Sequence, residues 1–260
     1  MPLTLTLAQI APPPEDPAAT LARIEALARA AAAAGSALLL LPELVLPGYN
    51  RPDLHAATTL GDGDGAGPGR IAAIARAAGV AICWGWAERD AEGRLWNAAS
   101  VVGADGARLG HYRKIQLFGP MERASFQPGL VLSEPFGLGG LRCGLLICYD
   151  IEFPEHARAL AARGCELLLV PTANPAGFPH VPDLLVPARA CENAVSVAYA
   201  NYAGTDRGLA FDGGSVICGP DGQVLARAGR GPALLTVTLP APAPGGGLST
   251  QAADLVRGIS

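Results

Sequence analysis

The chain opens with alternating apolar and polar positions. Leu3, Leu5 and Leu7 share one face of an extended segment, and Thr4 and Thr6 share the other. A period of two is typical of a strand with one face turned to the core. The first element predicted is therefore a strand.

A strand–helix–strand passage is predicted at the start of the chain. Asp16-Pro17 supplies an N-cap and a first-turn proline, and helix-forming residues run from there to about Ala34, where Gly35 ends the helix. The continuous apolar run 36–41 has the length of a strand covered on both faces. After a Gly-rich stretch at 61–69, an Ala-rich helix is expected over about 71–78.

The rest of the chain alternates strands with helices. Strands are expected at 80–88, 95–103, 108–114, 141–147, 166–170 and 195–201, and helices at 154–163 and around 188–193. Residues 214–218, 223–228 and 233–239 indicate a β meander, and the Pro- and Gly-rich tail from 240 is expected to hold one short helix. No repeat or composition break divides the chain, so we expect one layered α/β domain.

Composition narrows the class of protein. Of 260 residues, 50% are hydrophobic and 16% are charged, which is enough apolar surface for a large core. The net charge of −4, without a basic cluster, disfavours nucleic acid as a partner. The apolar runs fall short of the about 18 residues that a membrane span needs, and residues 1–7 lack signal-peptide character. Six cysteines without a CxxC pair are expected to be reduced thiols, so we expect a cytoplasmic protein.

Lysine occurs once in the sequence. The 19 basic residues comprise 18 arginines and Lys114, so an ordinary surface cation in this chain is an arginine. A compact ammonium at a site too small for a planar guanidinium would explain the exception, and chance is the alternative.

Three reactive side chains follow predicted strands. Glu43 comes after 36–41, Lys114 ends 108–114, and Cys148 comes after 141–147. Loops at the carboxyl ends of strands are where α/β proteins gather functional groups. Taken singly, Cys148 could be a small buried hydrophobe and Glu43 a surface ion-pair partner; their joint placement favours a site. The turn after Cys148 and the helix from Pro154 are also suited to activating a thiolate. The other five cysteines fall in or beside predicted elements, where we expect inert thiols.

Metal and nucleotide motifs are lacking in the sequence. The four histidines have no zinc-like spacing with cysteines or carboxylates, and residues 61–69 lack the Lys-Ser/Thr of a P-loop. The three tryptophans, Trp84, Trp86 and Trp96, lie on predicted strands and are interpreted as core or interface residues.

Five segments together resemble one family. They are Leu41–Tyr49, Tyr112–Glu122, Gly144–Glu155, Pro187–Ala194 and Phe211–Ser215. In this order they are similar to the nitrilase superfamily of carbon–nitrogen hydrolases over nearly the whole chain. The resemblance implies a four-layer α-β-β-α sandwich in a single domain, assigned to residues 1–240, and a homodimer or larger homo-oligomer. The tail 241–260 is then a candidate for the oligomer interface.

The resemblance also implies a Glu-Lys-Cys triad of Glu43, Lys114 and Cys148. A second acid of the family matches Glu122, and the backbone N–H of Tyr149 is expected to help Lys114 stabilise an oxyanion. The implied reaction splits a carboxamide into a carboxylic acid and ammonia through a thioester, without metal or organic cofactor.

Within the superfamily the chain looks most like the amidases, including stereoselective ones that act on amino-acid-like carboxamides. True nitrilases commonly carry Trp-Glu after the cysteine, where this chain has Tyr149-Asp150. Carbamoylases often place arginines at the positions of Ile151 and Glu152. Nitrilase, N-carbamoyl hydrolase and acyltransferase activities remain alternatives, as does an inactive binding relative.

Substrate contacts are expected from Glu152, Asn174 and Tyr49. A glutamate at position 152 would attract a protonated amine on the acyl part of the substrate; alternatively it pairs with Arg158 or Arg189. Arg189 and Glu192, three residues apart on a predicted helix, are interpreted as a structural ion pair.

Overall fold

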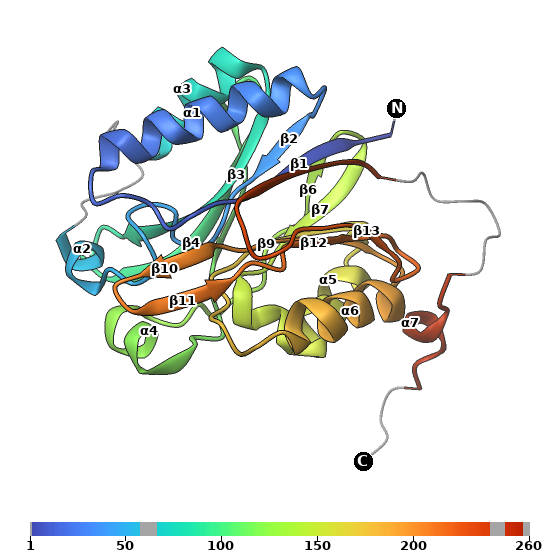
Figure 1. Ribbon diagram of the computed structural model, residues 1–260. Coiled ribbons are helices and arrows are strands. Elements are labelled where there is room, and N and C mark those ends of the chain that lie inside the picture. Colours follow the sequence, from blue (N-terminus) through green and yellow to red (C-terminus); the bar gives the residue numbers. More distant parts are fainter. Residues whose placement is uncertain (1, 58–66, 240–247, 257–260) are drawn as a thin grey trace.

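The computed structural model describes residues 2–57, 67–239 and 248–256. Within them, two six-stranded sheets face each other and helices cover both outer faces, which gives the four-layer α-β-β-α sandwich expected from the sequence (Figure 1). The first sheet has the order β14-β1-β2-β3-β4-β5 and the second the order β13-β12-β9-β8-β7-β6, while β10 and β11 form a separate hairpin.

The first sheet contains β1 (Thr4–Gln9), β2 (Leu38–Leu40), β3 (Ala81–Arg89), β4 (Leu95–Val102), β5 (Arg108–Arg113) and β14 (Ala233–Thr238). The second contains β6 (Phe136–Leu138), β7 (Leu141–Leu145), β8 (Leu167–Pro171), β9 (Ser196–Ala200), β12 (Val216–Cys218) and β13 (Val224–Arg227). The hairpin strands are β10 (Ala203–Asp206) and β11 (Leu209–Asp212).

The helices are α1 (Pro17–Ala33), α2 (Pro52–Ala57), α3 (Pro68–Ala78), α4 (Gly119–Ser125), α5 (Pro154–Ala162), α6 (Val186–Asn193) and α7 (Gln251–Asp254). A 3-10 turn spans Cys148–Glu152 and a π turn spans Val181–Leu185. No helix in residues 2–57, 67–239 or 248–256 has the length and apolarity of a bilayer span.

Local sequence signals explain the first elements. Asp16 caps α1 by accepting the N–H of Ala18 on its Oδ1 at 2.9 Å, and Pro17 occupies the first helical position. The alternation in β1 places Leu5 and Leu7 in the layer between the two sheets. Both predictions are confirmed.

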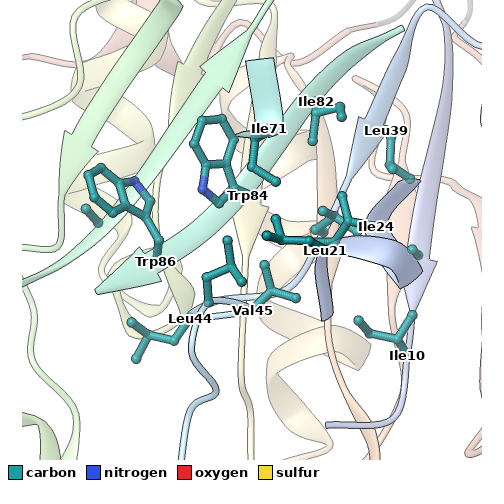
Figure 2. Packing of buried hydrophobic residues seen from close by; sticks show 14 of the residues in the cluster. Ile10, Leu21, Ile24, Leu39, Leu44, Val45, Ile71, Ile82, Trp84 and Trp86 are labelled. Atoms are coloured by element: carbon teal, nitrogen blue, oxygen red, sulfur yellow. The ribbon is translucent and has the colours of Figure 1, made fainter. Parts of the chain in front are cut away.

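Three apolar layers hold the sandwich together. The outer layer of the first sheet packs under α1 and α3, and Figure 2 shows Trp84 and Trp86 there with Leu21, Ile24 and Ile71. A second layer lies between the sheets, and a third lies between the second sheet and helices α5 and α6. Trp84 and Trp86 are thus core residues, as interpreted from the sequence.

Parallel pairing within each sheet gathers loop residues at one edge. β1, β2 and β3 are parallel neighbours, as are β7, β8 and β9. The carboxyl ends of these parallel strands therefore lie along one edge of each sheet. Glu43 follows β2 and Cys148 follows β7 at that edge.

The expected β meander is wrong in its last step. β12 pairs with β13, but β14 pairs antiparallel with β1 in the other sheet, with Leu7 opposite Leu235. A local pattern predicts that 233–239 is a strand, but it does not predict which strand pairs with it. The half-buried strand β14 pairs with β1, which lies at the opposite end of the chain.

Short elements were missed by the sequence analysis. These are α2, α4, β6 and the β10–β11 hairpin. Each is seven residues or shorter, too short for a periodic pattern to stand out. Helix α3 begins at Pro68, three residues before the expected start. The Gly-rich stretch 61–69 falls outside the described residues except for 67–69.

Candidate active site

One buried lysine joins two buried carboxylates. Lys114 Nζ donates to Oε1 of Glu43 at 2.7 Å and to Oε1 of Glu122 at 2.8 Å, and all three side chains are 0% exposed. Asn97 donates from Nδ2 to the same oxygen of Glu43 at 2.7 Å, and the Tyr49 hydroxyl donates to Oε1 of Glu122 at 2.7 Å. Hydrogen bonds thus join three of the four residues expected to be catalytic, and the fourth, Cys148, lies within electrostatic range of all three.

Close backbone packing sets the position of Glu43. The residue lies in the loop after β2, and this loop rests directly on Gly85 of β3. A Cβ on Gly85 would come within 2.5 Å of the Glu43 Cα and 2.4 Å of the Leu44 nitrogen. The Tyr202 hydroxyl also donates to the Glu43 carbonyl at 2.8 Å. Only glycine at position 85 lets the loop approach the sheet this closely.

Lys114 and Glu122 come from one continuous segment. The lysine follows the last residue of β5, and its N–H donates to the Asn97 carbonyl of β4 at 2.8 Å. Glu122 lies in the first turn of α4 and accepts the Phe118 N–H on Oε2 at 3.1 Å. The short helix that the sequence analysis missed is therefore the element that turns the second acid toward the lysine.

Cys148 occupies the first position of the 3-10 turn after β7. Its φ angle is +45°, in the left-handed region that non-glycine residues rarely adopt, and its side chain is buried. The N–H of the next residue, Tyr149, has no hydrogen-bond acceptor within the described parts of the chain. Such an unpaired N–H at the start of a helical turn is available to an anionic atom beside the sulfur.

The charge states of the site follow from burial. Burial raises the pKa of Glu43 to about 7; the ammonium of Lys114 lowers it and the charge of Glu122 raises it further. For Lys114, burial lowers the pKa, but the two carboxylates outweigh burial and the net direction is upward. At neutral pH the lysine is charged and Glu43 is poised between its two forms.

The cysteine is a thiol at rest. Burial raises the pKa of Cys148 well above its usual value and Glu43 adds to the rise, although Lys114 and the Thr172 hydroxyl oppose it. The position of Cys148 before a turn and a helix is therefore not enough to lower the pKa of this thiol, and forming the thiolate requires a base. The turn is too short and too deeply buried to offset the loss of water around the sulfur.

The expectation of inert cysteines fails at one position. Cys191 on α6 is exposed, while Cys83, Cys143, Cys165 and Cys218 are buried. The helix around 188–193 was predicted, but which of its faces meets the sheet was not. An alkylating reagent can therefore reach Cys191.

An aromatic cluster borders the candidate site. The Phe118 ring lies 5.2 Å from that of Tyr149 and 5.8 Å from that of Phe178, and the Tyr149 ring lies 5.0 Å from that of Phe153. One cavity of about 500 Å³ is lined by Tyr149 and Phe153, and another of about 500 Å³ by Asn174 and Phe178. The cluster therefore contributes walls to two cavities.

The expected substrate-binding residues have different surroundings. Tyr49 is buried and its hydroxyl is bound to Glu122. Asn174 lines the second cavity, but its Nδ2 donates to the Phe178 carbonyl at 3.0 Å. Glu152 is half-buried in the turn that begins at Cys148. Burial raises the pKa of its carboxyl, and His180, Lys114 and Arg189 lower it.

The alternative partners considered for Glu152 bind elsewhere. Arg189 donates to the backbone carbonyls of Ile151 at 3.1 Å and Glu152 at 2.9 Å, and it pairs with Glu192 at 3.0 Å, as the i,i+3 spacing predicted. In the described residues, neither Arg189 nor Arg158 forms an ion pair with the Glu152 carboxylate. Arg189 thus supports the turn while leaving the Glu152 carboxylate unpaired.

Two polar residues of the site were missed from the sequence. Asn97 lies on β4, inside the run Leu95–Val102 that is otherwise mostly apolar, and Thr172 directly follows β8. A buried amide in such a strand is a usable signal, because it requires a polar partner. That partner, Glu43, is 54 residues away in sequence. Within 2–57, 67–239 and 248–256, no cluster of three or more His, Cys, Asp or Glu residues could hold a metal ion.

Comparison with known proteins assigns this fold and site to a family. The family model described as Carbon-nitrogen hydrolase matches residues 4–243. The chain belongs to the carbon–nitrogen hydrolase family. The hydrolase is 45% identical over 238 residues to the "Hydrolase in pqqF 5'region" of Pseudomonas protegens, covering 91% of this chain and 82% of the other. It is 42% identical over 152 residues to an (R)-stereoselective amidase of a Pseudomonas species, covering 58% and 54% of the two chains.

Solved structures agree with this assignment. The hydrolase superposes on a double mutant of the amidase from Nesterenkonia sp. AN1 in complex with acrylamide, with a TM-score of 0.90, 38% identity and coverage of 98% of this chain and 94% of that one. Another mutant of that amidase shows covalent addition of the acetamide moiety of fluoroacetamide at its active-site cysteine. This second structure superposes with a TM-score of 0.87 at 41% identity, and the match covers 92% of this chain and 90% of that one. The carbon–nitrogen hydrolase described here is thus an amidase-like member of the nitrilase superfamily.

Proposed function

We propose that the hydrolase converts a small carboxamide and water into a carboxylic acid and ammonia through a thioester on Cys148. The observation that carries the proposal is the unequal pairing of the two carboxylates. Oε1 of Glu43 accepts from Lys114 and Asn97, but Oε2 is buried without a hydrogen-bond partner. Both oxygens of Glu122 accept hydrogen bonds. Glu43 therefore has a free basic oxygen and Glu122 has none.

Acylation begins with the Cys148 thiol. Glu43 Oε2 removes the thiol proton as the sulfur bonds to the amide carbon, and the carbonyl oxygen becomes an oxyanion. An ammonium has three protons, and Lys114 uses two of them on Glu43 and Glu122. The third proton, together with the Tyr149 N–H, stabilises the oxyanion. The C–N bond then breaks, Glu43 returns its proton to the nitrogen, and ammonia leaves.

Deacylation uses the same base. Glu43 takes a proton from water while the hydroxide oxygen bonds to the thioester carbon. The C–S bond breaks, the carboxylic acid leaves, and the sulfur regains its proton. A base with a pKa of about 7 can both accept and return a proton near neutral pH, which both half-reactions require.

Other residues have supporting roles in this proposal. Glu122, held by Tyr49 and the Phe118 N–H, orients Lys114, so Tyr49 is assigned to this network and not to the substrate. The aromatic rings of Phe118, Tyr149 and Phe178, clustered at the residue that follows Cys148, are proposed to favour a small acyl group.

The experiment that tests the reaction measures ammonia release from butyramide, butyronitrile and an N-carbamoyl amino acid, with Cys148→Ala as the blank. We expect release from butyramide and a butyryl adduct on Cys148 in the mass spectrum of quenched enzyme. Faster release from the nitrile or the carbamoyl compound would replace the amidase assignment by that activity. Unchanged release by Cys148→Ala would refute the proposed nucleophile. Formation of butyrohydroxamate faster than butyric acid when hydroxylamine is added would favour acyl transfer.

Glu152 leads to a narrower proposal about the substrate. Its carboxylate has no ion-pair partner in the described residues and lies within electrostatic range of His180, Lys114 and Arg189. A half-buried, unpaired carboxylate at the end of the turn that carries the proposed nucleophile favours an acyl group with a protonated amine. Asn174, which lines a cavity together with Phe178, is proposed to contact the same acyl group.

The matched substrates for this proposal are 2-aminobutyramide and butyramide, which differ only in the amine. We expect Glu152→Gln to lower the ratio of their kcat/KM values by about tenfold, since losing one charge-assisted hydrogen bond is worth about 1.5–3 kcal/mol at most. Glu155→Gln, which removes an exposed carboxylate three residues away, is the control. Equal ratios of the two kcat/KM values in wild type and Glu152→Gln would exclude Glu152 from substrate choice.

Two expectations from the sequence stay predictions. They are a homo-oligomer with the tail 241–260 at its interface, and a cytoplasmic location.

A further inference from the structure

Asp150 is a buried carboxylate outside the hydrogen-bond network of Lys114. It lies two residues after Cys148 in the 3-10 turn and is 0% exposed. Three donors surround it: the Ile147 N–H binds Oδ2 at 3.0 Å, the Tyr112 hydroxyl binds Oδ2 at 2.9 Å, and the Gln116 N–H binds Oδ1 at 2.9 Å. Both oxygens are thus used as acceptors.

These donors come from the two segments that carry the proposed nucleophile and the lysine. Ile147 directly precedes Cys148, whose backbone is held at a φ of +45°. Tyr112 and Gln116 lie two residues before and two residues after Lys114. The Tyr112 oxygen additionally accepts the Ile115 N–H at 3.3 Å. One carboxylate therefore connects the strained turn of the second sheet to the lysine loop of the first.

The connection requires an ionised carboxylate. Two of the three donors are backbone N–H groups, which can donate but cannot accept. The Gln116 N–H faces Oδ1 of Asp150 and the Ile147 N–H faces Oδ2. An asparagine would place its NH₂ group against the Ile147 N–H in one orientation and against the Gln116 N–H in the other. Either orientation leaves two donors facing each other in a buried site.

We propose that Asp150 is a positioning residue, which sets the distance and angle between Cys148 and Lys114 by holding their two loops together. It acts through backbone groups and Tyr112 and does not touch the substrate. This inference rests on the proposed function, because it assumes that Cys148 and Lys114 act on the same carbonyl group. An error of about 1 Å in such a pair costs about 100-fold in rate.

The test compares Asp150→Asn and Tyr112→Phe with wild type, using butyramide at a temperature well below the unfolding midpoint. Rates are divided by the amount of native protein, and thermal unfolding is recorded for each variant. We expect Asp150→Asn to lower kcat per native molecule by about 10²-fold with a smaller change in KM, since the geometry of reaction is disturbed more than substrate binding. Tyr112→Phe removes one of three donors and keeps the carboxylate, so we expect a fall of about tenfold.

The controls separate this proposal from its alternatives. Asp105→Asn makes the same change in an exposed turn, where the carboxylate accepts the Ala107 N–H at 2.9 Å and no other hydrogen bond from the described residues, and it should leave kcat unchanged. Cys148→Ala supplies the blank: if it kept its activity, the proposed function would fail, whatever Asp150 does. A lowered Tm with wild-type kcat per native molecule in Asp150→Asn would overturn the positioning role and leave a structural one. If Asp150→Asn does not fold, wild-type kcat in Tyr112→Phe overturns it instead.

Discussion

Two ion networks of this hydrolase each pair two carboxylates with one or two cations; one network is fully buried, and in the other both carboxylates are exposed. In the buried network, Lys114 alone stands between Glu43 and Glu122, at 2.7 and 2.8 Å. In the exposed network, Arg207 lies 2.6 Å from Glu15 and 3.2 Å from Asp53, and Arg51 lies 3.3 Å from Asp53.

The same kind of pairing has opposite effects on the carboxylates. The hydrogen bond from Arg207 lowers the pKa of Glu15, whereas burial raises the pKa of Glu43 to about 7 in spite of Lys114. Water reaches both carboxylates of this network and Arg207, although Arg51 is buried, so the cations there only add to an already favourable ionised state of the carboxylates. In the buried network two carboxylates share one cation away from bulk solvent, and the pKa of Glu43 is raised to about 7, which suits its proposed role as a base near neutral pH.

The largest effect is expected from removing the buried cation. Lys114→Ala leaves two buried carboxylates facing each other, which should cost about 3–5 kcal/mol in the free energy of unfolding and abolish ammonia release. Lys114→Arg keeps the charge but must fit a planar guanidinium into a fully buried slot, so we expect a loss of about 10²–10³ in kcat/KM. Urea unfolding and butyramide turnover measure both quantities. Arginine with more than a tenth of the wild-type rate would show that the compact ammonium is not required.

Glu43→Gln should separate activity from stability. Its Oε1 can still accept from Lys114 and Asn97, while the base is lost, so we expect kcat to fall by about 10²–10⁴. In wild type the native state holds the Glu43 proton more tightly than the unfolded chain does. The contribution of this group to stability therefore falls as pH rises from 4.5 towards about 7, and Gln removes that loss. The expected Tm at pH 8 is equal to or above that of wild type; a clearly lower Tm would contradict this account.

Glu122→Gln should move the pH profile. The charge of Glu122 raises the pKa of Glu43, so removing it shifts that pKa from about 7 toward its usual value. The acid limb of kcat/KM against pH for butyramide is then expected to move to lower pH, whatever the change in its plateau. An unmoved limb would mean that the two carboxylates do not interact, or that Glu43 is not the group observed.

The smallest effect is expected from the same substitution in the exposed network. Glu15→Gln removes one partner each of Arg207 and Arg51, and both arginines keep Asp53. We expect a change in Tm of less than about 2 °C, because exposed pairs are solvated and screened. The rate and pH profile with butyramide should match wild type. A shift in the acid limb comparable to that of Glu122→Gln would contradict the distinction between the two networks.

Much of the architecture follows from local patterns. The cap at Asp16, the alternation of Leu5 and Leu7, and the apolar run of β2 each predicted an element that the structure contains. Short elements such as α4 have no such pattern. The pairing of β14 with β1 depends on residues more than 200 positions apart, such as Leu7 and Leu235, and no local signal records it.

The sequence by itself determined which chemical groups the site contains: an acid after one strand, the single lysine after another, and a cysteine after a third. Tertiary structure alone decided what each group can do. Glu43 is the proposed base because Asn97 and Lys114 occupy one of its oxygens and leave the other free, whereas Tyr49 and Phe118 complete the pairing of Glu122. Burial also makes Cys148 a resting thiol and leaves Cys191 exposed. Basicity and accessibility depend on desolvation and on partner atoms from distant segments, and only the folded chain brings these together.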